Sequence, residues 1–209
     1  MIRVLVANGK GGCGKTTIAT TMAAAFACGG LATALADADR QRLALAWLAF
    51  RPSGAAPIAA LDWHNGTGDA PPRTQRLVVD APAGLRAGRL GDLLDAADLV
   101  VVPLLPSVLD EAGTRRFLVR LEALKPVRKG RKAVLAVANR VRPRSRALGR
   151  LETFLAEAGH PPTARLTDRV LYADLARRGL GLFDLDPSRY RAVRAEWLPL
   201  LAAVEASAG

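Results

Sequence analysis

The sequence has few cysteines, few aromatic residues and no long hydrophobic run. Its two cysteines, Cys13 and Cys28, are too few for a disulfide framework and lack the CxxC spacing of zinc and iron–sulfur sites, so we expect reduced thiols. No stretch approaches the roughly 18 consecutive apolar residues of a membrane span. Met1 leads directly into the strand-like run 2–7 rather than into a signal peptide. These absences argue against secreted and membrane-spanning classes, and we expect a cytoplasmic protein.

Positive charge is in excess and is unevenly distributed. The 209 residues include 30 Lys and Arg against 19 Asp and Glu, a formal net charge of +11, of which residues 105–209 hold +9. An excess of this size favours a polyanionic partner such as nucleic acid. A compositional origin stays open, because 25 of the 30 basic residues are Arg. Half of the residues are hydrophobic, enough for one core, so we expect a single domain over residues 1–209.

Short apolar runs alternate with longer amphipathic stretches along most of the chain. This alternation is typical of an α/β fold, and we expect three layers: a mostly parallel, twisted sheet covered by helices on both faces. The continuous apolar character of the runs predicts strands that are buried on both faces. The expected strands span residues 2–7, 32–36, 58–61, 77–79, 99–103 and 133–138.

Helical periodicity is clearest in three segments. Residues 16–27 and residues 111–124 each place their apolar side chains on one stripe. Residues 187–206 form a C-terminal helical region, which we expect to bend at Pro199. Segments rich in Gly and Pro between the strands are typical of loops.

The strongest motif lies between the first expected strand and the first expected helix. Residues 9–16 fit the GxxxxGK[ST] pattern of phosphate-binding P-loops, and they predict the three-layer fold of P-loop NTPases. The glycines let the backbone curl around a triphosphate, so that successive amides and the helix N-terminus face phosphate oxygens. Lys15 would neutralise β- and γ-phosphate charge, and the Thr16 hydroxyl would complete a Mg²⁺ shell. The predicted contacts are Gly11, Gly12, Cys13, Gly14, Lys15, Thr16 and Thr17.

A second lysine, Lys10, stands at the start of this loop, where an ordinary P-loop requires no base. In this feature the sequence resembles the ParA/MinD family of deviant Walker ATPases. In that family the equivalent lysine reaches across a nucleotide-sandwich dimer to the partner's phosphates, as an arginine finger does elsewhere. The resemblance implies a homodimer that forms with ATP, in which Lys10 acts as a catalytic residue beside Lys15.

Two acidic segments follow in the order that the family shows. Asp37 and Asp39 resemble its DxDxQ segment, and alternation in an extended chain would point both side chains toward the phosphates. By resemblance, Asp39 orients the attacking water, Asp37 supports the metal or the loop, and Asp80 holds Mg²⁺ through water at a Walker B strand end. Thr16, Asp39 and Asp80 are the predicted metal-site residues. Arg40 departs from the proline often found at its position.

Later segments extend the resemblance to about residue 185. Asn139 stands where the family's base-contacting Asn lies at a strand end, and its amide can both donate to and accept from adenine, which favours ATP. Arg140 beside it is a further predicted nucleotide contact. Arg169, Tyr172 and Gly179 resemble the family's late switch-like segment.

Basic side chains gather at several places in the second half of the chain. The sparse aromatic residues argue against stacking on single strands, whereas phosphate contact with duplex DNA needs only cations. One group of five lies close together, at Lys125, Arg128, Lys129, Arg131 and Lys132. The DNA-binding candidates are Arg142, Arg144, Arg146, Arg150, Arg169, Arg177 and Arg178.

The sequence therefore supports one main hypothesis about function. An ATP-bound dimer assembles a basic surface that holds nucleoid DNA without sequence preference, a cargo-bound partner protein stimulates slow hydrolysis, and hydrolysis releases the DNA. Such a cycle would partition or position a plasmid, a chromosome region or a protein cargo. The first strand begins at residue 2, so we expect no N-terminal helix-turn-helix extension and no operator binding.

Two alternatives come from other classes. A MinD-like membrane cycle would need an amphipathic C-terminal anchor; residues 189–201 are basic and apolar, but Glu196, Pro199 and the small-residue tail favour a docked helix, so we expect no membrane partner. A small-molecule kinase or ligase would share the fold and the P-loop. Lys10 and the Arg-rich second half argue against it.

Overall fold

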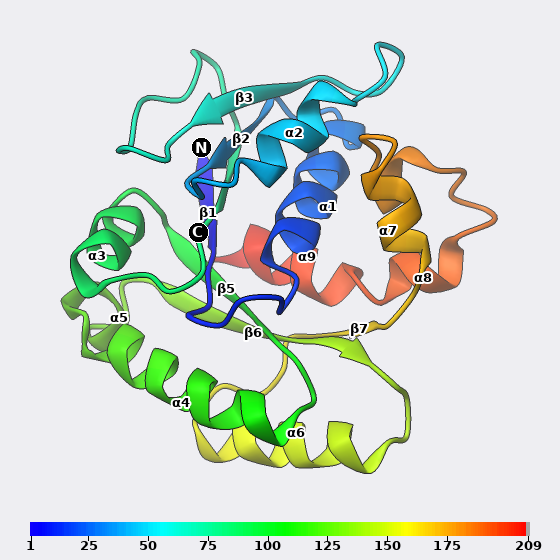
Figure 1. Ribbon diagram of the computed structural model, residues 1–209. Coiled ribbons are helices and arrows are strands. Elements are labelled where there is room, and N and C mark those ends of the chain that lie inside the picture. Colours follow the sequence, from blue (N-terminus) through cyan, green and yellow to red (C-terminus); the bar gives the residue numbers. More distant parts are fainter. Residues whose placement is uncertain (208–209) are drawn as a thin grey trace.

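The computed structural model describes residues 1–207, apart from the side chains of residues 108–111. Seven strands form one sheet in the order β3-β2-β4-β1-β5-β6-β7, and every neighbouring pair is parallel (Figure 1). The predicted α/β fold with a parallel sheet is confirmed. The strands are β1 (Ile2–Val6), β2 (Thr33–Asp37), β3 (Ile58–Asp62), β4 (Arg76–Asp80), β5 (Leu99–Leu104), β6 (Ala133–Val141) and β7 (Ala164–Thr167).

Six of these strands begin within one residue of the predicted positions. Their apolar runs explain this agreement, because helices cover both faces of the central strands. Every residue of β2 and β5 is buried. Strand β7 was not predicted. It has four residues, its burial alternates, and it forms the edge of the sheet beside β6.

Helices cover both faces of the sheet (Figure 1). One apolar cluster joins the sheet to α1, α2, α9 and the short 3₁₀ helix η1, and a second joins the opposite face to α3, α4 and α6. The helices are α1 (Lys15–Cys28), α2 (Leu43–Ala49), α3 (Ala87–Asp95), α4 (Val108–Ala123), α5 (Lys125–Arg128), α6 (Arg146–Glu157), α7 (Leu171–Ala176), η1 (Leu182–Asp184), α8 (Arg191–Ala195) and α9 (Leu198–Ala206). Within the described residues, no helix is long and apolar enough to cross a bilayer.

The C-terminal region contains two helices, α8 and α9, and the break lies at Glu196 and Trp197. The prediction of a bend at Pro199 was wrong: that proline lies in the first turn of α9, where a missing amide costs no hydrogen bond. The side chains of the two residues at the break form hydrogen bonds with residues outside the C-terminal region. The Glu196 carboxylate accepts from the Thr167 amide, and the Trp197 indole donates to the Tyr172 hydroxyl, 2.8 Å in each case. These contacts end α8 before the proline is reached.

Because all strands are parallel, their carboxyl ends meet at one edge of the sheet. Asp37 is paired in register with Asp80, and Val6 is paired with Asp80 on its other side. The glycine-rich loop follows β1 at this same edge, and Asn139 lies near the end of β6. Ligands of open parallel sheets bind at such an edge.

Candidate nucleotide-binding site

The glycine-rich loop connects β1 to α1 and depends on backbone conformations that glycine favours. Gly12 and Gly14 have φ angles of 77° and 92°, in the left-handed region. Gly14 is the N-cap of α1, and a Cβ atom built on it would lie 2.3 Å from Nδ2 of Asn139. That amide donates to the Cys13 carbonyl at 2.8 Å. The structure therefore brings Asn139, 125 positions after Gly14, directly against the loop.

Asn8 fixes the start of the loop, although it lies outside the P-loop pattern and was not predicted. Its side chain is 1% exposed, donates from Nδ2 to the Pro103 carbonyl at 2.8 Å, and accepts from the Lys10 amide at 3.0 Å. The loop is thereby tied to β5, the strand beside β1. A polar residue directly between an apolar strand and a run of glycines was the available signal.

The two lysines of the loop have different surroundings. Lys15 is 8% exposed, and its Nζ donates to the Lys10 carbonyl at 3.0 Å, within the curve of the loop. Lys10 is exposed at the beginning of the loop. Cys13 is 2% exposed, and its Sγ contacts the same carbonyl at 3.4 Å. Lys15 is thus placed inside the loop and Lys10 on its outside.

Asp80, at the end of β4, is one of two buried acids of the site. It is 1% exposed, and its Oδ2 accepts from the Thr16 hydroxyl at 2.7 Å. Its Oδ1 is buried without a hydrogen-bond partner in the described part of the chain. Burial raises the pKa of this carboxyl to about 7. A buried carboxylate oxygen beside a hydroxyl is the donor set that a hard divalent cation prefers, so these residues fit Mg²⁺.

Asp37 hydrogen-bonds the backbone of the loop after β2 and of the first turn of α2, as its predicted loop-supporting role requires. Its carboxylate accepts from the amides of Asp39 at 3.0 Å, Ala44 at 2.8 Å and Leu45 at 3.1 Å, and it is fully buried. Burial raises its pKa, and these backbone hydrogen bonds oppose the rise. The side chain therefore fixes the backbone of the loop after β2 and of the first turn of α2. Direct contact of Asp37 with a nucleotide stays a prediction.

Asp39 lies in the wall of a cavity of about 490 Å³ between the loop after β2 and the loop after β4. Arg40, Arg86 and His64 line the same cavity. The Asp39 carboxylate accepts from the Gln41 amide at 3.0 Å. The loop after β4 also contacts the P-loop, because the Gly84 amide donates to the Gly9 carbonyl at 3.1 Å. The structure thus gathers Asp39 and the loop after Asp80 around one space.

A second cavity, of about 370 Å³, is lined by Asn139, the predicted base contact, and by Arg140, the predicted nucleotide contact beside it. Thr17 and Tyr172 also line it. Arg140 has a φ angle of 50° and lies at a shift in the pairing of β6 with β7. Such a bulge re-aims a side chain beside a site. Thr17, a predicted P-loop contact, therefore lines the same cavity as Asn139 and Arg140.

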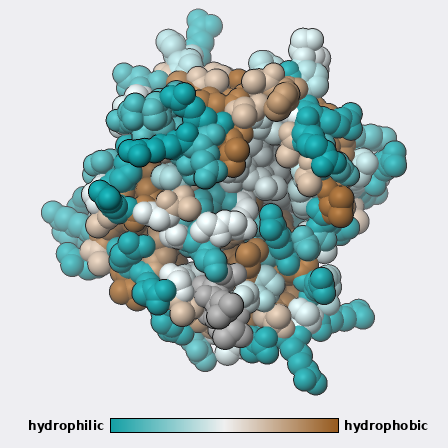
Figure 2. Space-filling model, viewed as in Figure 1, coloured by the Kyte–Doolittle hydropathy of each residue, from teal (hydrophilic) through white to brown (hydrophobic). Residues whose placement is uncertain are grey.

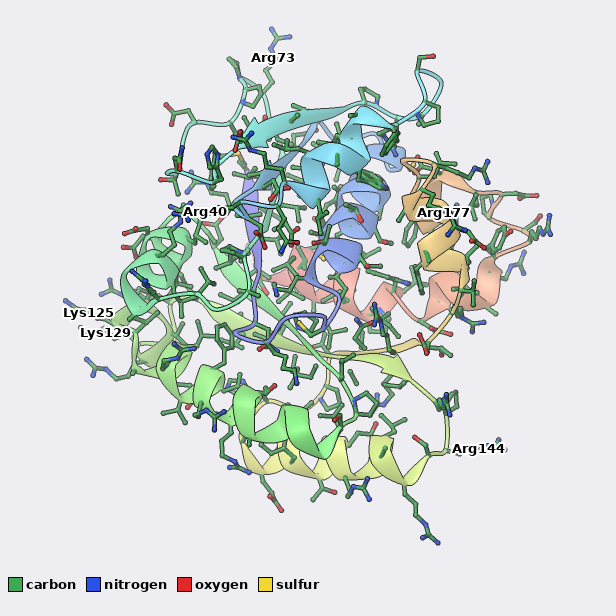
Figure 3. The ribbon with its side chains drawn as sticks, in the orientation of Figure 1. Arg40, Arg73, Lys125, Lys129, Arg144 and Arg177 are labelled. Carbon is green, nitrogen blue, oxygen red and sulfur yellow. The ribbon has the colours of Figure 1, made fainter. Side chains whose placement is uncertain are left out.

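Basic side chains that were predicted to bind DNA fall into separate places. Arg142, Arg144, Arg146 and Arg150 are all exposed between the end of β6 and the first turns of α6. Arg169 pairs with Glu196 at 2.8 Å and lines the cavity that contains Asn139. Arg177 and Arg178 are exposed after α7, with Arg177 paired to Asp174. Figure 3 shows Arg144 and Arg177 well apart along one side of the molecule.

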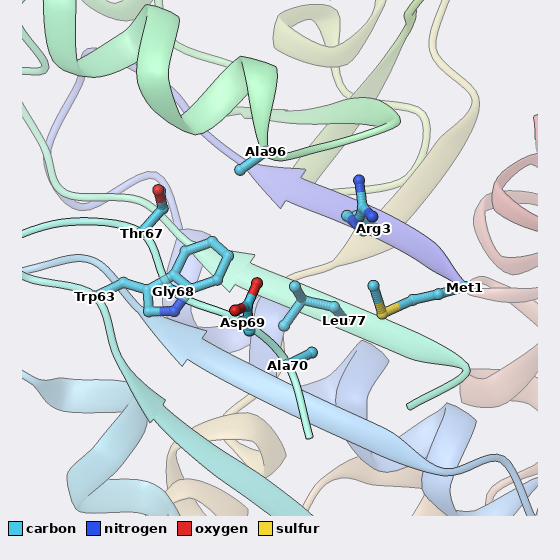
Figure 4. Close-up of a pocket in the computed structure, with 9 residues that line it drawn as sticks. All are labelled: Met1, Arg3, Trp63, Thr67, Gly68, Asp69, Ala70, Leu77 and Ala96. Atoms are coloured by element: carbon cyan, nitrogen blue, oxygen red, sulfur yellow. The ribbon is translucent and has the colours of Figure 1, made fainter. Parts of the chain in front are cut away.

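A further cavity, of about 380 Å³, opens beside the starts of β1 and β4 (Figure 4). Arg3 and Leu77, near the starts of β1 and β4, form one wall, and Trp63 and Asp69 form another. It contains no predicted site residue.

Comparison with known proteins identifies relatives over most of the chain. A family model described as the CobQ/CobB/MinD/ParA nucleotide binding domain matches residues 4–187. The Maintenance of carboxysome distribution protein A of Halothiobacillus neapolitanus is 30% identical over 187 residues, which cover 86% of each chain.

Solved structures show the same fold. The MinC:MinD cell division protein complex of Aquifex aeolicus matches with a TM-score of 0.76 and 16% identity, over 99% of this chain and 96% of that one. The ATP complex of a Cyanothece McdA variant matches with a TM-score of 0.73 and 15% identity, over 96% of each chain. At these identities the structures establish the fold alone.

Proposed function

The chain belongs to the CobQ/CobB/MinD/ParA family of nucleotide-binding domains, and from this membership we propose that it is a ParA-type ATPase that positions a cargo. It dimerises around ATP, holds duplex DNA in that state, and releases it after hydrolysis. The family match confirms the resemblance predicted from the glycine-rich loop and Lys10. A relative named for carboxysome distribution, matched over 86% of its length, supports cargo positioning.

The geometry around Asp80 is the observation that carries the nucleotide part of the proposal. Its orphaned oxygen and the Thr16 hydroxyl would hold Mg²⁺, and Lys15 would contact the phosphates from within the loop. When bound, ATP would supply the phosphoryl group, and Mg²⁺ would partly neutralise the negative charge of that group. The chain's own contribution is positioning, since Asn8 ties the loop to β5 and Asn139 ties it to β6.

Asp39 and Lys10 would complete the reaction centre. The Asp39 carboxylate lies in a cavity at the edge of the loop and would accept a hydrogen bond from water there, which orients the water for attack. Lys10, exposed on the outside of the loop, would reach the phosphates bound by a second copy. Dimerisation and ATP occupancy would then be one event.

The exposed arginines after β6 support DNA as the surface on which the dimer is held. Arg142, Arg144, Arg146 and Arg150 carry four charges over nine residues that contain no acid. Contacts of this kind bind phosphates without reading sequence. A cargo-bound partner protein would then stimulate hydrolysis and free the dimer.

Neither alternative gains support from the structure. The apolar side chains Leu200 and Val204 of α9 are buried in the core, so they are not available to a membrane surface. A kinase or ligase for small molecules would need a second substrate held near Asp39. The cavity beside Asp39 is lined by arginines and by the loop after β4, and these residues do not by themselves indicate a second substrate.

Sedimentation of the purified protein with no nucleotide, ADP and ATP tests the dimer. We expect a monomer without nucleotide and a dimer with ATP, and we expect Asp39→Ala to prolong the dimer because hydrolysis is lost. Lys10→Ala should stay monomeric while it still binds ATP. Dimerisation that Lys10→Ala leaves unchanged would remove the basis of the proposed cycle.

A further inference from the structure

Lysine is used sparingly in this chain, at five positions against 25 arginines. Two of the five, Lys10 and Lys15, belong to the P-loop. The other three, Lys125, Lys129 and Lys132, lie within eight residues in and after α5. An Arg-rich composition does not explain this clustering of lysine, so the segment needs an account of its own.

The segment forms a fixed turn that presents four cations to solvent. The four, hereafter the basic turn, are Lys125, Arg128, Lys129 and Arg131. The turn is closed by backbone hydrogen bonds from the Gly130 amide to the Val127 carbonyl at 2.8 Å and from the Arg131 amide to the Pro126 carbonyl at 2.9 Å. Gly130 has a φ angle of 65°, which ends α5.

The fifth basic residue, Lys132, anchors this turn to the fold. Its ammonium donates to the carbonyls of Leu94 and Ala97 at the C-terminal end of α3, where carbonyls lack helical partners. Asp95 and Asp98 also lie near this ammonium and partly neutralise it. None of the ion pairs among the described residues involves the four cations of the basic turn.

The basic turn is at the edge of the sheet opposite the nucleotide site. It directly precedes Ala133, the first residue of β6, whereas Asn139 and Arg142 lie at the other end of that strand. The nine residues of β6 separate its two ends by about 26 Å, at roughly 3.3 Å per step. Figure 3 labels Lys125 and Lys129 at one side of the molecule and Arg144 at the other.

The chemistry of the surface favours a phosphate backbone over a lipid surface. Among the described residues, the large hydrophobic side chains that are exposed all lie outside residues 124–133. Figure 2 shows hydrophilic side chains at the margin where Figure 3 places Lys125 and Lys129. A membrane-binding surface would combine cations with apolar side chains that enter the lipid.

We propose that the basic turn is a second phosphate-binding surface, which holds duplex DNA independently of nucleotide. It rests on the proposed function only for the choice of DNA as the polyanion. Its independence of nucleotide follows from its position, because its contacts run to α3 and not to the P-loop or to the loops around Asp39. In a dimer joined through the nucleotide edges, two such turns would face outward and keep released subunits near DNA.

Binding of nucleotide-free protein to a random 30-base-pair duplex, over a salt series, tests this proposal. Four phosphate contacts give a slope of log affinity against log salt of about −3.6, at about −0.9 per contact. Changing Lys125, Arg128 and Lys129 together to Gln should reduce the slope to about −0.9. Changing both lysines to Arg should keep the wild-type slope, since charge is retained.

A matched control removes the same charge elsewhere. Arg73, Arg189 and Arg191 are exposed and lie outside the basic turn, and their joint change to Ala should leave the nucleotide-free slope unaltered. Thermal unfolding and ATP binding of each variant establish that it folds. Equal losses in the Gln variant and in this control would overturn the proposal, because general charge would then explain binding.

Further outcomes distinguish this proposal from the proposed ATP-dependent function and from binding to a lipid surface. Absence of nucleotide-free DNA binding in the wild type would overturn it, even if ATP-dependent binding were found and the proposed function stood. Vesicles of phosphatidylcholine and phosphatidylglycerol form a parallel arm. Capture by vesicles that the Gln variant loses, without capture by duplex DNA, would replace DNA by a lipid surface. If Lys10→Ala keeps the wild-type salt dependence of DNA binding without nucleotide, the result supports the basic turn. This support holds even if ATP-dependent DNA binding is not found.

Discussion

At the scale of single residues, Asp80 is the side chain whose environment is least favourable to its charge. It is buried, it contacts Thr16, and one oxygen has no hydrogen-bond partner in the described chain. A rise in pKa from 3.8 to about 7 corresponds to on the order of 4 kcal/mol of differential interaction between its two protonation states. The folded protein without metal therefore binds this proton more tightly than the unfolded chain does.

This difference predicts that the protein without nucleotide and metal loses stability as pH rises. The stabilisation from protonated Asp80 is fully present below the unfolded pKa near 3.8 and disappears as pH rises through about 7. Asp37, whose pKa is also raised, acts in the same direction. Denaturant titrations from pH 5 to pH 8 should show a falling free energy of unfolding, with a weaker fall in Asp80→Asn.

An exposed acid provides the control for this titration. Asp95→Asn removes a carboxyl at the surface end of α3 and should leave the wild-type pH dependence intact. A pH dependence that is the same in Asp80→Asn and in the wild type would show that the buried carboxyl does not control it. Added Mg²⁺ should reduce the fall, because it stabilises the ionised form.

The two glycines with positive φ angles in the P-loop predict unequal costs of substitution. Ala at either position is strained, by about 1–3 kcal/mol. At Gly14 the new Cβ would also lie 2.3 Å from Nδ2 of Asn139, whereas at Gly12 no atom lies within 4 Å. Displacing Asn139 breaks its hydrogen bond to Cys13, at a further cost of about 1–3 kcal/mol. Chemical denaturation without nucleotide should show Gly14→Ala as the less stable variant; equal stabilities would contradict this account.

A local sequence pattern marks the residues of the P-loop but not the distant residues that contact them. Gly14, Lys15 and Thr16 follow a local pattern, because the chemistry of the loop is contained within eight consecutive residues. The contact of Asn139 with Cys13 and that of Asn8 with Pro103 join distant positions, and no local pattern encodes them.

At the scale of elements, a buried ion pair joins the segment after α2 to η1. Arg51 donates to both carboxylate oxygens of Asp184, at 2.9 and 2.7 Å, and the side chains are 6% and 5% exposed. Gly179 packs so closely here that a Cβ would lie 2.3 Å from the Arg51 amide nitrogen. These contacts hold the late segment of the chain against α1 and α2.

Breaking this pair should therefore be costly. Arg51→Ala leaves the Asp184 carboxylate buried without its partner, which costs about 3–5 kcal/mol. Arg177→Ala is the matched control, since its pair with Asp174 is exposed and should contribute within about 1 kcal/mol. Urea denaturation compares them, and a loss in Arg51→Ala no larger than that in Arg177→Ala would show that the buried pair does not join these elements.

The strands of the sheet show where sequence patterns predict elements and where they do not. Apolar runs predicted β1 to β6, because burial on both faces demands continuous hydrophobicity. Strand β7 contains the exposed Arg165 and depends on pairing with β6, so its sequence carries no such signal. The bulge at Arg140 depends on the same pairing. In the C-terminal region, Glu196 and Trp197 set the helix break through contacts with distant residues.

At the scale of the whole molecule, the parallel sheet separates two kinds of surface. Its carboxyl edge carries the P-loop, Asp39 and the arginines after β6, and its amino edge carries the basic turn. In the proposed cycle, the first edge joins two copies when ATP is bound. DNA affinity should therefore have a nucleotide-dependent part and a constant part.

The central claim is that ATP-driven dimerisation through Lys10 creates the DNA-holding state. Its most direct test is the affinity for random duplex DNA with no nucleotide, ADP and ATP, in the wild type and in Lys10→Ala. We predict that ATP raises the affinity of the wild type by roughly 100-fold, because dimerisation makes the second contact intramolecular. ADP should not raise it, and Lys10→Ala should keep only the nucleotide-free affinity. Equal affinity in all three states, or a full ATP response in Lys10→Ala, would contradict the account.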